Sequence, residues 1–283
     1  MRRVLGIDVG GTKIAIGVSG ADGPEIAAVV RLETGENPLA GALHAARGLD
    51  RSPAAVGFST CGVIRDGRVL LAPNVPGWNG LELPRLLREE YGTIPVAIGN
   101  DVKAAAAAEL RWGALRGVST GVYLNLGTGL AAAPVVGGQV VHGAHGAAGE
   151  IGYLLSEPGE AAFADGHAPL EERFSGAALA RRGSALLGRT VTASALFELP
   201  EAAGLVDQAL RTLAMSVANL CVVLDPERVV VGGGMMGARA RILPRLATEV
   251  RRAVPFPPEV RAARFTDDAP LLGALALAHA AAP

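Results

Sequence analysis

Cysteine is nearly absent from this sequence: its 283 residues include only Cys61 and Cys221. Two cysteines so far apart, in unrelated contexts, indicate small buried residues in a reducing compartment, not a disulfide framework. No spacing typical of a zinc site is present. The sequence therefore excludes the small secreted domains that depend on disulfides for their stability.

Long hydrophobic runs are missing as well. The apolar run that follows Met1-Arg2-Arg3 is interrupted by Asp8, too early for a secretory signal, and no later run is long enough to span a bilayer. These absences predict a cytoplasmic protein with no membrane partner.

The sequence also lacks an excess of either positive or negative charge. The chain has 26 Lys and Arg and 27 Asp and Glu, a formal net charge of −1. It contains no basic run with interleaved aromatic residues, so it lacks the electrostatic pattern that nucleic-acid binding needs. We expect no nucleic-acid partner. Lysine occurs only at Lys13 and Lys103, which indicates a composition bias but makes both positions conspicuous.

What the sequence does contain is typical of a compact α/β protein. Hydrophobic residues make up 50% of the chain, which includes 38 glycines. Apolar β-branched runs alternate with helical patterns, and the length suits one large domain or two lobes. Strands are predicted at 4–7, 14–18, 54–58, 96–98, 122–126, 130–136 and 228–231, and helices at 83–90, 101–112, 204–224, 239–252 and 269–281.

Two similar segments, one in each half of the chain, predict a strand, a glycine turn and a second strand. When Asp8 is aligned with Asn125, Gly10 falls on Gly127 at the same offset. This weak internal repeat predicts two lobes, with a boundary near the glycines of 112–120. Glycine turns expose backbone N–H groups that can bind anions, so two such turns together suggest ATP.

Each glycine turn also has a simpler interpretation, because most glycine turns only join strands. Neither turn matches a Walker A loop or the dinucleotide-binding fingerprint. A third cluster, Gly232-Gly233-Gly234, lies between a predicted strand and a predicted helix. That layout is typical of a ligand site at the carboxyl ends of strands, and equally of a tight turn that needs no ligand.

Two carboxylates are candidates for chemistry. Asn100-Asp101 follows a predicted strand and opens an alanine-rich helix, so Asp101 lies at or near the helix N-cap. Capping is the default role, and catalysis is the alternative because ligands bind at the carboxyl ends of strands. Glu150 lies in a loop of small residues, where a charged group usually faces ligand or water. His142 and His145 lie near this loop, but we assign no metal to them.

Taken in order, these motifs resemble the ROK family of bacterial sugar kinases and sugar-responsive repressors over essentially the whole chain. Asp8–Lys13 and Gly127–Gly129 resemble its two phosphate motifs, and Asn100-Asp101 resembles its catalytic motif. Three further matches are Asn74–Trp78, which resembles the segment that closes over the sugar, Gly146–Gly152, which resembles the sugar loop, and Leu170-Glu171 with Ser175-Gly176.

The resemblance implies a two-lobed actin-like, ribonuclease-H-like fold with ATP and sugar in an interlobe cleft. Its lobes would be 1–115 and 116–265, with a C-terminal helix at about 266–283 packing back on the first. Asp101 would accept the proton of the sugar hydroxyl, and Asp8 would hold hydrated Mg²⁺. The implied sugar contacts are Asn74, Asn100, Glu150, Tyr153 and Glu171; the implied nucleotide contacts are Asp8, Gly10, Gly11, Thr12, Lys13, Gly127, Thr128, Gly129, Gly232, Gly233 and Gly234.

The sequence departs from the family where a zinc site is usual. Tyr153 stands at the position of the family's histidine, and the stretch 155–170 contains no cysteine. Because a structural zinc needs four good donors, we predict no zinc site. The segment would then be ordered by packing, with Phe163, Leu170 and Phe174 as the apolar residues available. Tyr153 would present its hydroxyl to the sugar or pack as a core aromatic.

The function implied is ATP-dependent phosphorylation of a hexose, with glucose at O6 first. Another hexose, or an N-acylated aminosugar such as N-acetylmannosamine, is the alternative substrate, and a non-catalytic sugar sensor is the alternative class. A repressor would need a DNA-binding segment ahead of the first phosphate motif; because the predicted hairpin begins at Val4, we expect a kinase and not a repressor. The expected partners are sugar and ATP, in a homodimer.

Overall fold

The computed structural model describes residues 3–20, 22–72, 75–266 and 268–283, and the chain divides into two compact units. Unit 1 comprises Met1–Arg116, His142–Ala148 and Asp268–Pro283, and unit 2 comprises Gly117–Val141 and Gly149–Asp267. The short segment 142–148 therefore packs with unit 1, although nothing in the sequence separates it from its neighbours.

Unit 1 is built on a five-stranded sheet with the strand order β3-β2-β1-β4-β7. The antiparallel hairpin comes first, and β4 and β7 add to it as parallel strands. The strands are β1 Val4–Val9, β2 Lys13–Ser19, β3 Ala28–Glu33, β4 Val56–Thr60 and β7 Val96–Asn100, with a separate hairpin of β5 Val63–Arg65 and β6 Arg68–Leu70. The sequence missed β3 because this edge strand mixes polar and apolar residues on an exposed surface.

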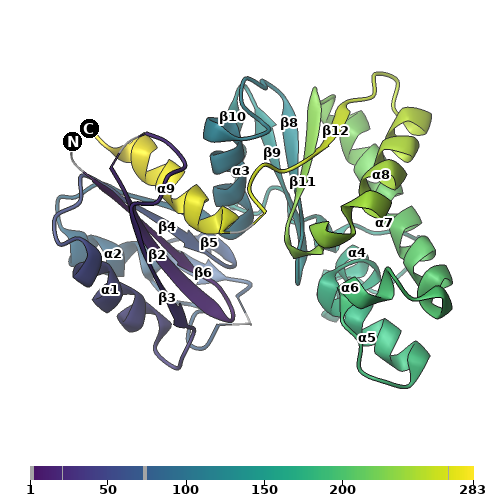
Figure 1. Cartoon of the computed structure of the whole chain (residues 1–283), viewed down its shortest axis with the longest axis horizontal. Helices are drawn as coiled ribbons and strands as arrows, with labels where there is room; N and C mark the ends of the chain where they lie inside the picture. The colour runs from purple at the N-terminus through teal and green to yellow at the C-terminus, as the bar shows by residue number, and fades with distance from the viewer. Residues whose placement is uncertain (1–2, 21, 73–74, 267) are drawn as a thin grey trace. The chain divides into compact units, whose positions relative to one another are not determined.

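Helices cover both faces of this sheet. The helices of unit 1 are α1 Pro38–Leu49, α2 Leu83–Tyr91, α3 Asp101–Trp112 and α9 Ala269–Ala281. Leu5, Ile7 and Phe58 share a core with residues of α1 and α2, whereas the alternate positions Gly6 and Gly57 lie against α9. Since successive residues of a strand point to opposite faces, α9 covers the face away from α1 and α2 (Figure 1).

Helix α9 lies unusually close to the sheet and to α3. A Cβ built on Gly57 would lie 1.7 Å from the carbonyl oxygen of Ala274, and one built on Gly273 would lie 2.1 Å from the carbonyl carbon of Ala104. The helix is apolar all round, as expected of a buried helix. The last helix of the chain thus completes the core of the unit that begins with the first strand.

Unit 2 repeats this plan. Its sheet has the strand order β10-β9-β8-β11-β12, again with an antiparallel hairpin followed by parallel strands. The strands are β8 Gly121–Leu126, β9 Leu130–Val136, β10 Gln139–Val140, β11 Arg228–Gly232 and β12 Glu259–Ala262. The α-helices are α4 Pro169–Arg173, α5 Gly176–Leu187, α6 Ala193–Leu196, α7 Ala203–Leu224 and α8 Arg239–Ala253, and the 3₁₀ helices are η1 Ile151–Tyr153, η2 Phe163–Asp165, η3 Pro200–Ala202 and η4 Gly234–Ala238.

The internal repeat predicted from the sequence is confirmed at the level of topology. Asp8 is the fifth residue of the six-residue β1, and Asn125 is the fifth residue of the six-residue β8. Each strand is followed by a glycine turn and a seven-residue antiparallel partner, β2 or β9. The predicted limits of α3 and α9 are those observed.

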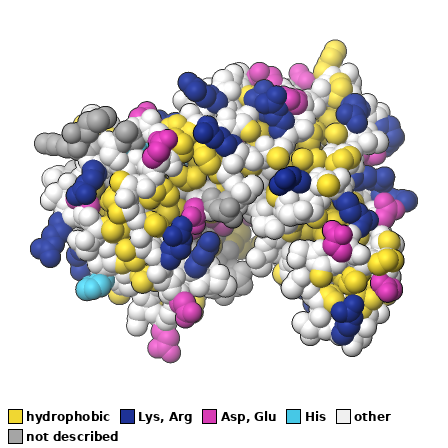
Figure 2. Space-filling model, in the orientation of Figure 1, with side chains coloured by type: hydrophobic (Ala, Val, Ile, Leu, Met, Phe, Trp, Pro, Cys, Tyr) yellow, Lys and Arg dark blue, Asp and Glu magenta, His cyan; other side chains and the backbone are white. Residues whose placement is uncertain are grey.

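None of the described helices combines the length and the apolar character that crossing a bilayer requires. On the face drawn in Figure 2, Lys and Arg side chains are interspersed with Asp and Glu side chains in both units.

The contact between α9 and α3 gives a test of the packing. Gly273→Ala should lower the free energy of unfolding by about 2–4 kcal/mol, because the added methyl group meets the rigid backbone of α3. Gly41→Ala, in α1, is the control: its Cβ has no heavy atom within 4 Å, so the loss of glycine flexibility should stabilise by about 0.5–1 kcal/mol. Urea unfolding measures both changes. Equal stability of the two variants would contradict the observed packing.

Candidate functional site

The parallel strands of unit 1 bring their carboxyl ends to one edge of the sheet. In the register of β1, β4 and β7, Asp8 lies beside Ser59, and Ser59 lies beside Gly99. Asn100 ends β7, and Asp101 begins α3 directly after it. Asp8 and Asp101 therefore share the edge where ligands bind in open α/β sheets.

Asp8 is a buried carboxyl group. Its side chain accepts a hydrogen bond from the Ser59 hydroxyl, with 2.7 Å between the oxygens. The pKa of Asp8 is raised to about 7, mainly by burial and also by the negative charge of Asp101, while the Ser59 hydrogen bond and Lys13 oppose the rise. A cation beside Asp8 would favour the ionised form, which makes this position suited to a metal ion.

Asn100, not Asp101, caps helix α3. The Asn100 side-chain oxygen accepts a hydrogen bond from the Lys103 backbone N–H at 2.8 Å. Asp101 is the first helical residue, and its carboxylate accepts from the Val102 backbone N–H at 2.9 Å. The default role predicted for Asp101, capping, is thus filled mainly by Asn100. Burial also raises the pKa of Asp101, although its two backbone hydrogen bonds and Lys103 lower it.

Lys103 is a buried lysine two residues after Asp101. Its side chain is 3% exposed, and its Nζ donates to the backbone oxygen of Gly146 at 2.8 Å. This bond ties segment 142–148 to helix α3 within unit 1. The sequence drew attention to Lys103 by the rarity of lysine, but nothing in it indicated this contact.

The glycine turn between β1 and β2 is stabilised by one hydrogen bond within it and by another from Thr34. The Gly10 backbone N–H donates to the oxygen of Lys13 at 3.0 Å, and the Thr34 hydroxyl donates to the oxygen of Gly10 at 2.8 Å. No sequence signal pointed to Thr34. The Lys13 side chain is exposed, with its Nζ 3.9 Å from Asp268, so a positive charge stands beside this turn.

The segment expected to close over the sugar is partly described. Asn74 lies outside the described residues. Trp78 is buried, and its indole N–H donates to the Thr60 hydroxyl at 2.6 Å. Because Thr60 ends β4, this bond fixes the segment's last residue to the same edge as Asp8 and Asn100.

In unit 2, the turn between β8 and β9 meets the first residues of helix α5. The oxygen of Gly127 accepts the N–H of Gly176 at 2.8 Å, and the oxygen of Thr128 accepts the N–H of Ala177 at 3.1 Å. A Cβ at Gly176 would lie 2.7 Å from the Gly127 oxygen. The Ser175-Gly176 motif therefore holds this turn in place.

Glu171 joins this turn to the loop that carries Glu150 and Tyr153. Its carboxylate accepts the backbone N–H of Leu130 at 2.8 Å, and Gly152 leaves room for it, since a Cβ at that position would lie 3.1 Å from the Cβ of Glu171. The pKa of Tyr153 is raised by burial, and then by the charges of Glu150 and Glu171. The three side chains thus form one cluster, the Glu171 cluster, of Glu150, Tyr153 and Glu171.

The predicted packing of the segment after Tyr153 is wrong in part. Leu170 and Phe174 are fully buried, as expected, but Phe163 is 61% exposed. Phe163 instead lies edge-on to the ring of Tyr153, with 5.3 Å between the ring centroids. Tyr153 is half-buried, so it is not a fully enclosed core aromatic.

The third glycine cluster is explained largely by packing. Gly233 has a φ of 94°, and a Cβ there would lie 2.5 Å from the Leu126 oxygen. A Cβ at Gly232 would lie 2.3 Å from the Tyr123 hydroxyl. Gly234 borders open space. The tight-turn interpretation accounts for Gly232 and Gly233, and contact with adenosine stays a proposal.

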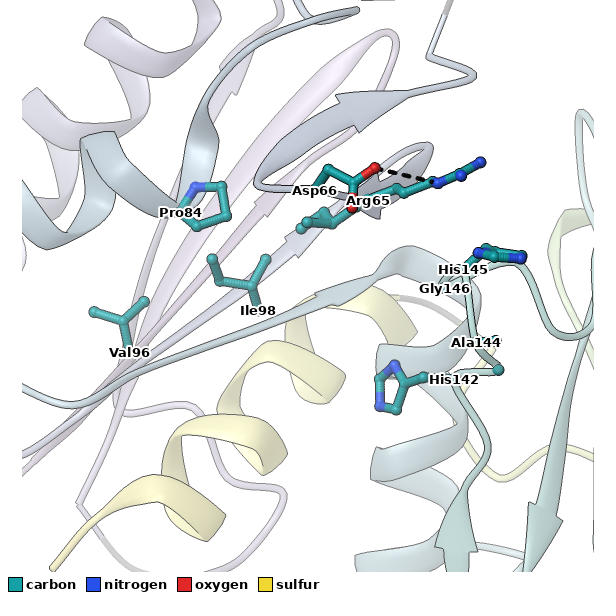
Figure 3. Close-up of a pocket in the computed structure, with 11 residues that line it drawn as sticks. Arg65, Asp66, Pro84, Val96, Ile98, His142, Ala144, His145 and Gly146 are labelled. Atoms are coloured by element: carbon teal, nitrogen blue, oxygen red, sulfur yellow. Dashed lines mark ion pairs between the residues drawn. The ribbon is translucent and has the colours of Figure 1, made fainter.

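A cavity of about 700 Å³ also lies within unit 1. Val96 and Ile98 from β7, together with Pro84, form its apolar wall, and His142 and His145 approach from segment 142–148 (Figure 3). Neither Asp8 nor Asp101 lines this cavity. It therefore lies apart from the carboxylate edge of the same unit.

Metal binding at the carboxylate edge would depend on ligands from the substrate. Within the described part of the chain, no group of three or more His, Cys, Asp or Glu side chains could hold a metal ion. Mg²⁺ usually binds through one or two carboxylates together with water and substrate phosphates. Buried Asp8, whose pKa is raised, fits that mode, and a dedicated protein cage does not.

The burial of Asp8 gives a pH-dependent prediction. Its pKa rises from 3.8 in the unfolded chain to about 7, so unfolding releases a proton between these values and the free energy of unfolding falls as the pH rises. Asp8→Asn removes the ionisable group and with it this fall in stability. The substitution should therefore change the free energy of unfolding of the ligand-free protein more favourably at pH 8 than at pH 4, by up to about 4 kcal/mol. Urea unfolding at both pH values measures it.

The exposed carboxylate of Asp66 is the control, because its side chain is 86% exposed. Asp66 also has a positive φ of 51°, which asparagine tolerates. Asp66→Asn should therefore leave the pH dependence unchanged. Parallel stability curves for wild type and Asp8→Asn would show that Asp8 is ionised in the folded protein at neutral pH.

Comparison with known proteins places the whole chain in one family. The model of the ROK family matches residues 4–281. The chain is 34% identical to the N-acetylmannosamine kinase of Shigella flexneri over 98% of each chain.

Solved structures agree with this. The chain is similar to a ROK hexokinase from Thermus thermophilus, with 34% identity, a TM-score of 0.83 and 98% of each chain covered. It is also similar to a ROK family glucokinase from Streptomyces griseus in complex with glucose and AMPPNP, with 28% identity, a TM-score of 0.79 and 98% and 99% of the two chains covered. With its two α/β units, the chain has the two-lobed actin-like sugar kinase fold and belongs to the ROK family.

Proposed function

We propose that this protein transfers the γ-phosphoryl group of ATP to the primary hydroxyl of a hexose, with O6 of glucose as the first candidate. The observation that carries the proposal is Asp101: a carboxylate at the carboxyl edge of the unit 1 sheet, directly after Asn100, with a pKa raised by burial. A general base works best when its pKa lies near the working pH, and burial moves Asp101 in that direction.

The proposed reaction needs little covalent chemistry from the protein. The sugar oxygen forms a bond to the γ-phosphorus, the bond from that phosphorus to the bridging oxygen breaks, and ADP leaves. Asp101 accepts the proton of the hydroxyl. Because phosphoryl transfer passes through a loose transition state, positioning and charge neutralisation supply most of the rate enhancement.

The nucleotide would be held by residues from both sequence repeats. The turns at Gly10–Lys13 and Gly127–Gly129 would contact phosphates, and Gly232–Gly234 would border adenosine. Mg²⁺ would enter with ATP and neutralise phosphate charge. Asp8 would ionise beside the cation, since an opposite charge lowers the pKa that burial has raised.

The sugar would be bound through hydrogen bonds to its hydroxyls. The proposed contacts are Asn74, Asn100, Glu150, Tyr153 and Glu171. A charged carboxylate pair with a phenol suits a polyhydroxy ligand, because such groups form strong, directional hydrogen bonds. An N-acylated aminosugar such as N-acetylmannosamine is the alternative substrate, and the similarity to the Shigella enzyme supports it.

The location and assembly follow from the same proposal. We place the protein in the cytoplasm, where ATP is available, and expect a homodimer. The outward-facing Val222 and Val223 of α7 are exposed apolar side chains that a second copy could cover.

The function is tested by measuring ADP release with a panel of sugars. Glucose, mannose, fructose, glucosamine, N-acetylglucosamine and N-acetylmannosamine are each offered with ATP and Mg²⁺. We expect the highest kcat/KM with glucose. Preference for N-acetylmannosamine would select the alternative substrate, and binding of a sugar without ADP release would indicate a sensor.

Asp101→Asn should abolish turnover and leave sugar and nucleotide affinity within a few fold. The amide keeps the shape of the carboxylate but cannot accept the proton, and the loss of a general base costs about 10²–10⁴-fold in rate. Steady-state kinetics gives kcat, and calorimetry gives the two affinities. If the variant retained most of the wild-type kcat, Asp101 would have no catalytic role.

The prediction that zinc is not bound can be tested on the same preparation. The purified protein should contain no stoichiometric zinc, and a chelator should leave its circular dichroism unchanged, because the stretch 155–170 offers carboxylates and one histidine but no thiolate. Activity should still require added Mg²⁺. Elemental analysis that found about one zinc per chain would contradict this prediction.

A further inference from the structure

The segment 154–168 connects the two helices that carry Tyr153 and Glu171 of the Glu171 cluster. It leaves η1, which ends at Tyr153, and enters α4, which carries Glu171; these two elements pack against each other. Leu155 and Phe163 within the segment are exposed. Apart from the edge-on contact of Phe163 with Tyr153, apolar side chains contribute little to its order, so polar contacts are needed to hold it.

Three of those contacts converge on one carboxylate. Glu160 accepts hydrogen bonds from the backbone N–H groups of Ser156 and Glu157, the second at 2.9 Å. Its other oxygen accepts from Nη2 of Arg173 at 2.6 Å. The Glu160 side chain is 14% exposed, and these donors, Arg173 first, lower its pKa to about 2. The group stays ionised throughout the physiological pH range.

Arg173 connects this carboxylate to the helices of unit 2. It is the last residue of α4, two positions after Glu171. Its Nη1 lies 3.3 Å from a carboxylate oxygen of Glu157, and its backbone oxygen accepts from Nη1 of Arg182 in α5 at 2.7 Å. A planar guanidinium that spans two carboxylates fixes direction as well as distance.

We propose that Glu160 and Arg173 are positioning residues for the sugar site: they close segment 154–168 and so hold Tyr153 and Glu171 at a fixed separation. The inference rests on the proposed function, since it assigns these two residues to the recognition of the sugar. Neither residue needs to touch the ligand. We call the contacts of Glu160 with Arg173, Ser156 and Glu157 the Glu160 clamp.

The physical reason is the cost of ordering a site when the ligand binds. Although η1 and α4 pack against each other, an open connection would leave more freedom in their relative position, and the sugar would have to remove that freedom on binding. The clamp makes that arrangement before the sugar arrives. Glu160 also accepts hydrogen bonds from two backbone N–H groups. Exchanging Glu160 and Arg173 would keep the ion pair but leave these N–H groups without their acceptor.

Glu160→Gln tests the clamp with little change of shape. One end of the amide donates instead of accepting, so it cannot satisfy both Arg173 and the two N–H groups. We expect the sugar KM to rise about three- to tenfold, the equivalent of one weakened hydrogen bond, with the ATP KM within twofold. The reversed pair, Glu160→Arg with Arg173→Glu, should not restore the sugar KM, because the backbone N–H groups lose their acceptor.

Glu249→Gln is the matched control, because Glu249 forms a two-bond contact with Arg252 on α8 and its side chain is 20% exposed. It should change neither KM. Arg173→Lys keeps the positive charge but loses the planar guanidinium that contacts two carboxylates. It should raise the sugar KM less than Glu160→Gln does, and it replaces Glu160→Gln as the test if that variant folds poorly.

Hydrogen exchange of the Ser156 and Glu157 amides in the sugar-free protein separates the clamp from the activity. Faster exchange in Glu160→Gln together with a higher sugar KM supports the proposal. Faster exchange with an unchanged sugar KM would limit the clamp to a structural role and overturn it, as would unchanged exchange. If the wild type phosphorylates no sugar in the panel, the proposed function fails, and the positioning role fails with it even where exchange shows that the clamp exists.

Discussion

The candidate site of unit 1 depends on the hydrogen-bond register of β1, β4 and β7. These three parallel strands are aligned so that Asp8, Ser59 and Gly99 form one row and Asn100 ends the sheet in the next. A shift of one residue in any strand would turn its side chains to the opposite face. Asp8 would then lose its Ser59 hydrogen bond, and Asp101 would begin its helix in a different place. Close packing of α9 on the glycines of the sheet maintains this register from the other side.

The strand register of unit 2 places a neutral side chain, Asn125, at the position that Asp8 occupies in unit 1. Asn125 stands where Asp8 stands, and it pairs with Gly232 across the parallel strands β8 and β11. An amide in this position has no charge to desolvate, whereas Asp8 keeps a raised pKa because its charge is costly to bury. One repeat therefore carries an ionisable group that a cation can bind, and the other presents neutral backbone and glycines. That asymmetry agrees with the proposal that Asp8, and not Asn125, binds Mg²⁺.

Order in the loops of unit 2 comes from hydrogen bonds more than from apolar burial. Glu171 binds the Leu130 N–H, Gly176 binds the Gly127 oxygen, and Glu160 binds Arg173. The first two bonds join elements that are distant in the sequence, and each of the three satisfies a backbone or charged group that would be costly to bury alone. Phe163 stays exposed, edge-on to the ring of Tyr153.

Local periodicity and the backbone freedom of glycine were enough to predict most of the sheet strands, five helices, the glycine turns and the repeat, but not the edge strand β3. The sequence also placed Asp101 at the start of α3 and indicated the family through the order of its motifs. Tertiary structure alone decided that Asn100 caps this helix, that Ser59 binds Asp8 across 51 positions of the chain, and that Lys103 reaches Gly146. The sequence did not indicate the hydrogen-bond partners of Glu160 either. Such contacts depend on which distant segments the fold brings together, and burial, which sets the pKa of Asp8, exists only once the surrounding strands and helices have packed.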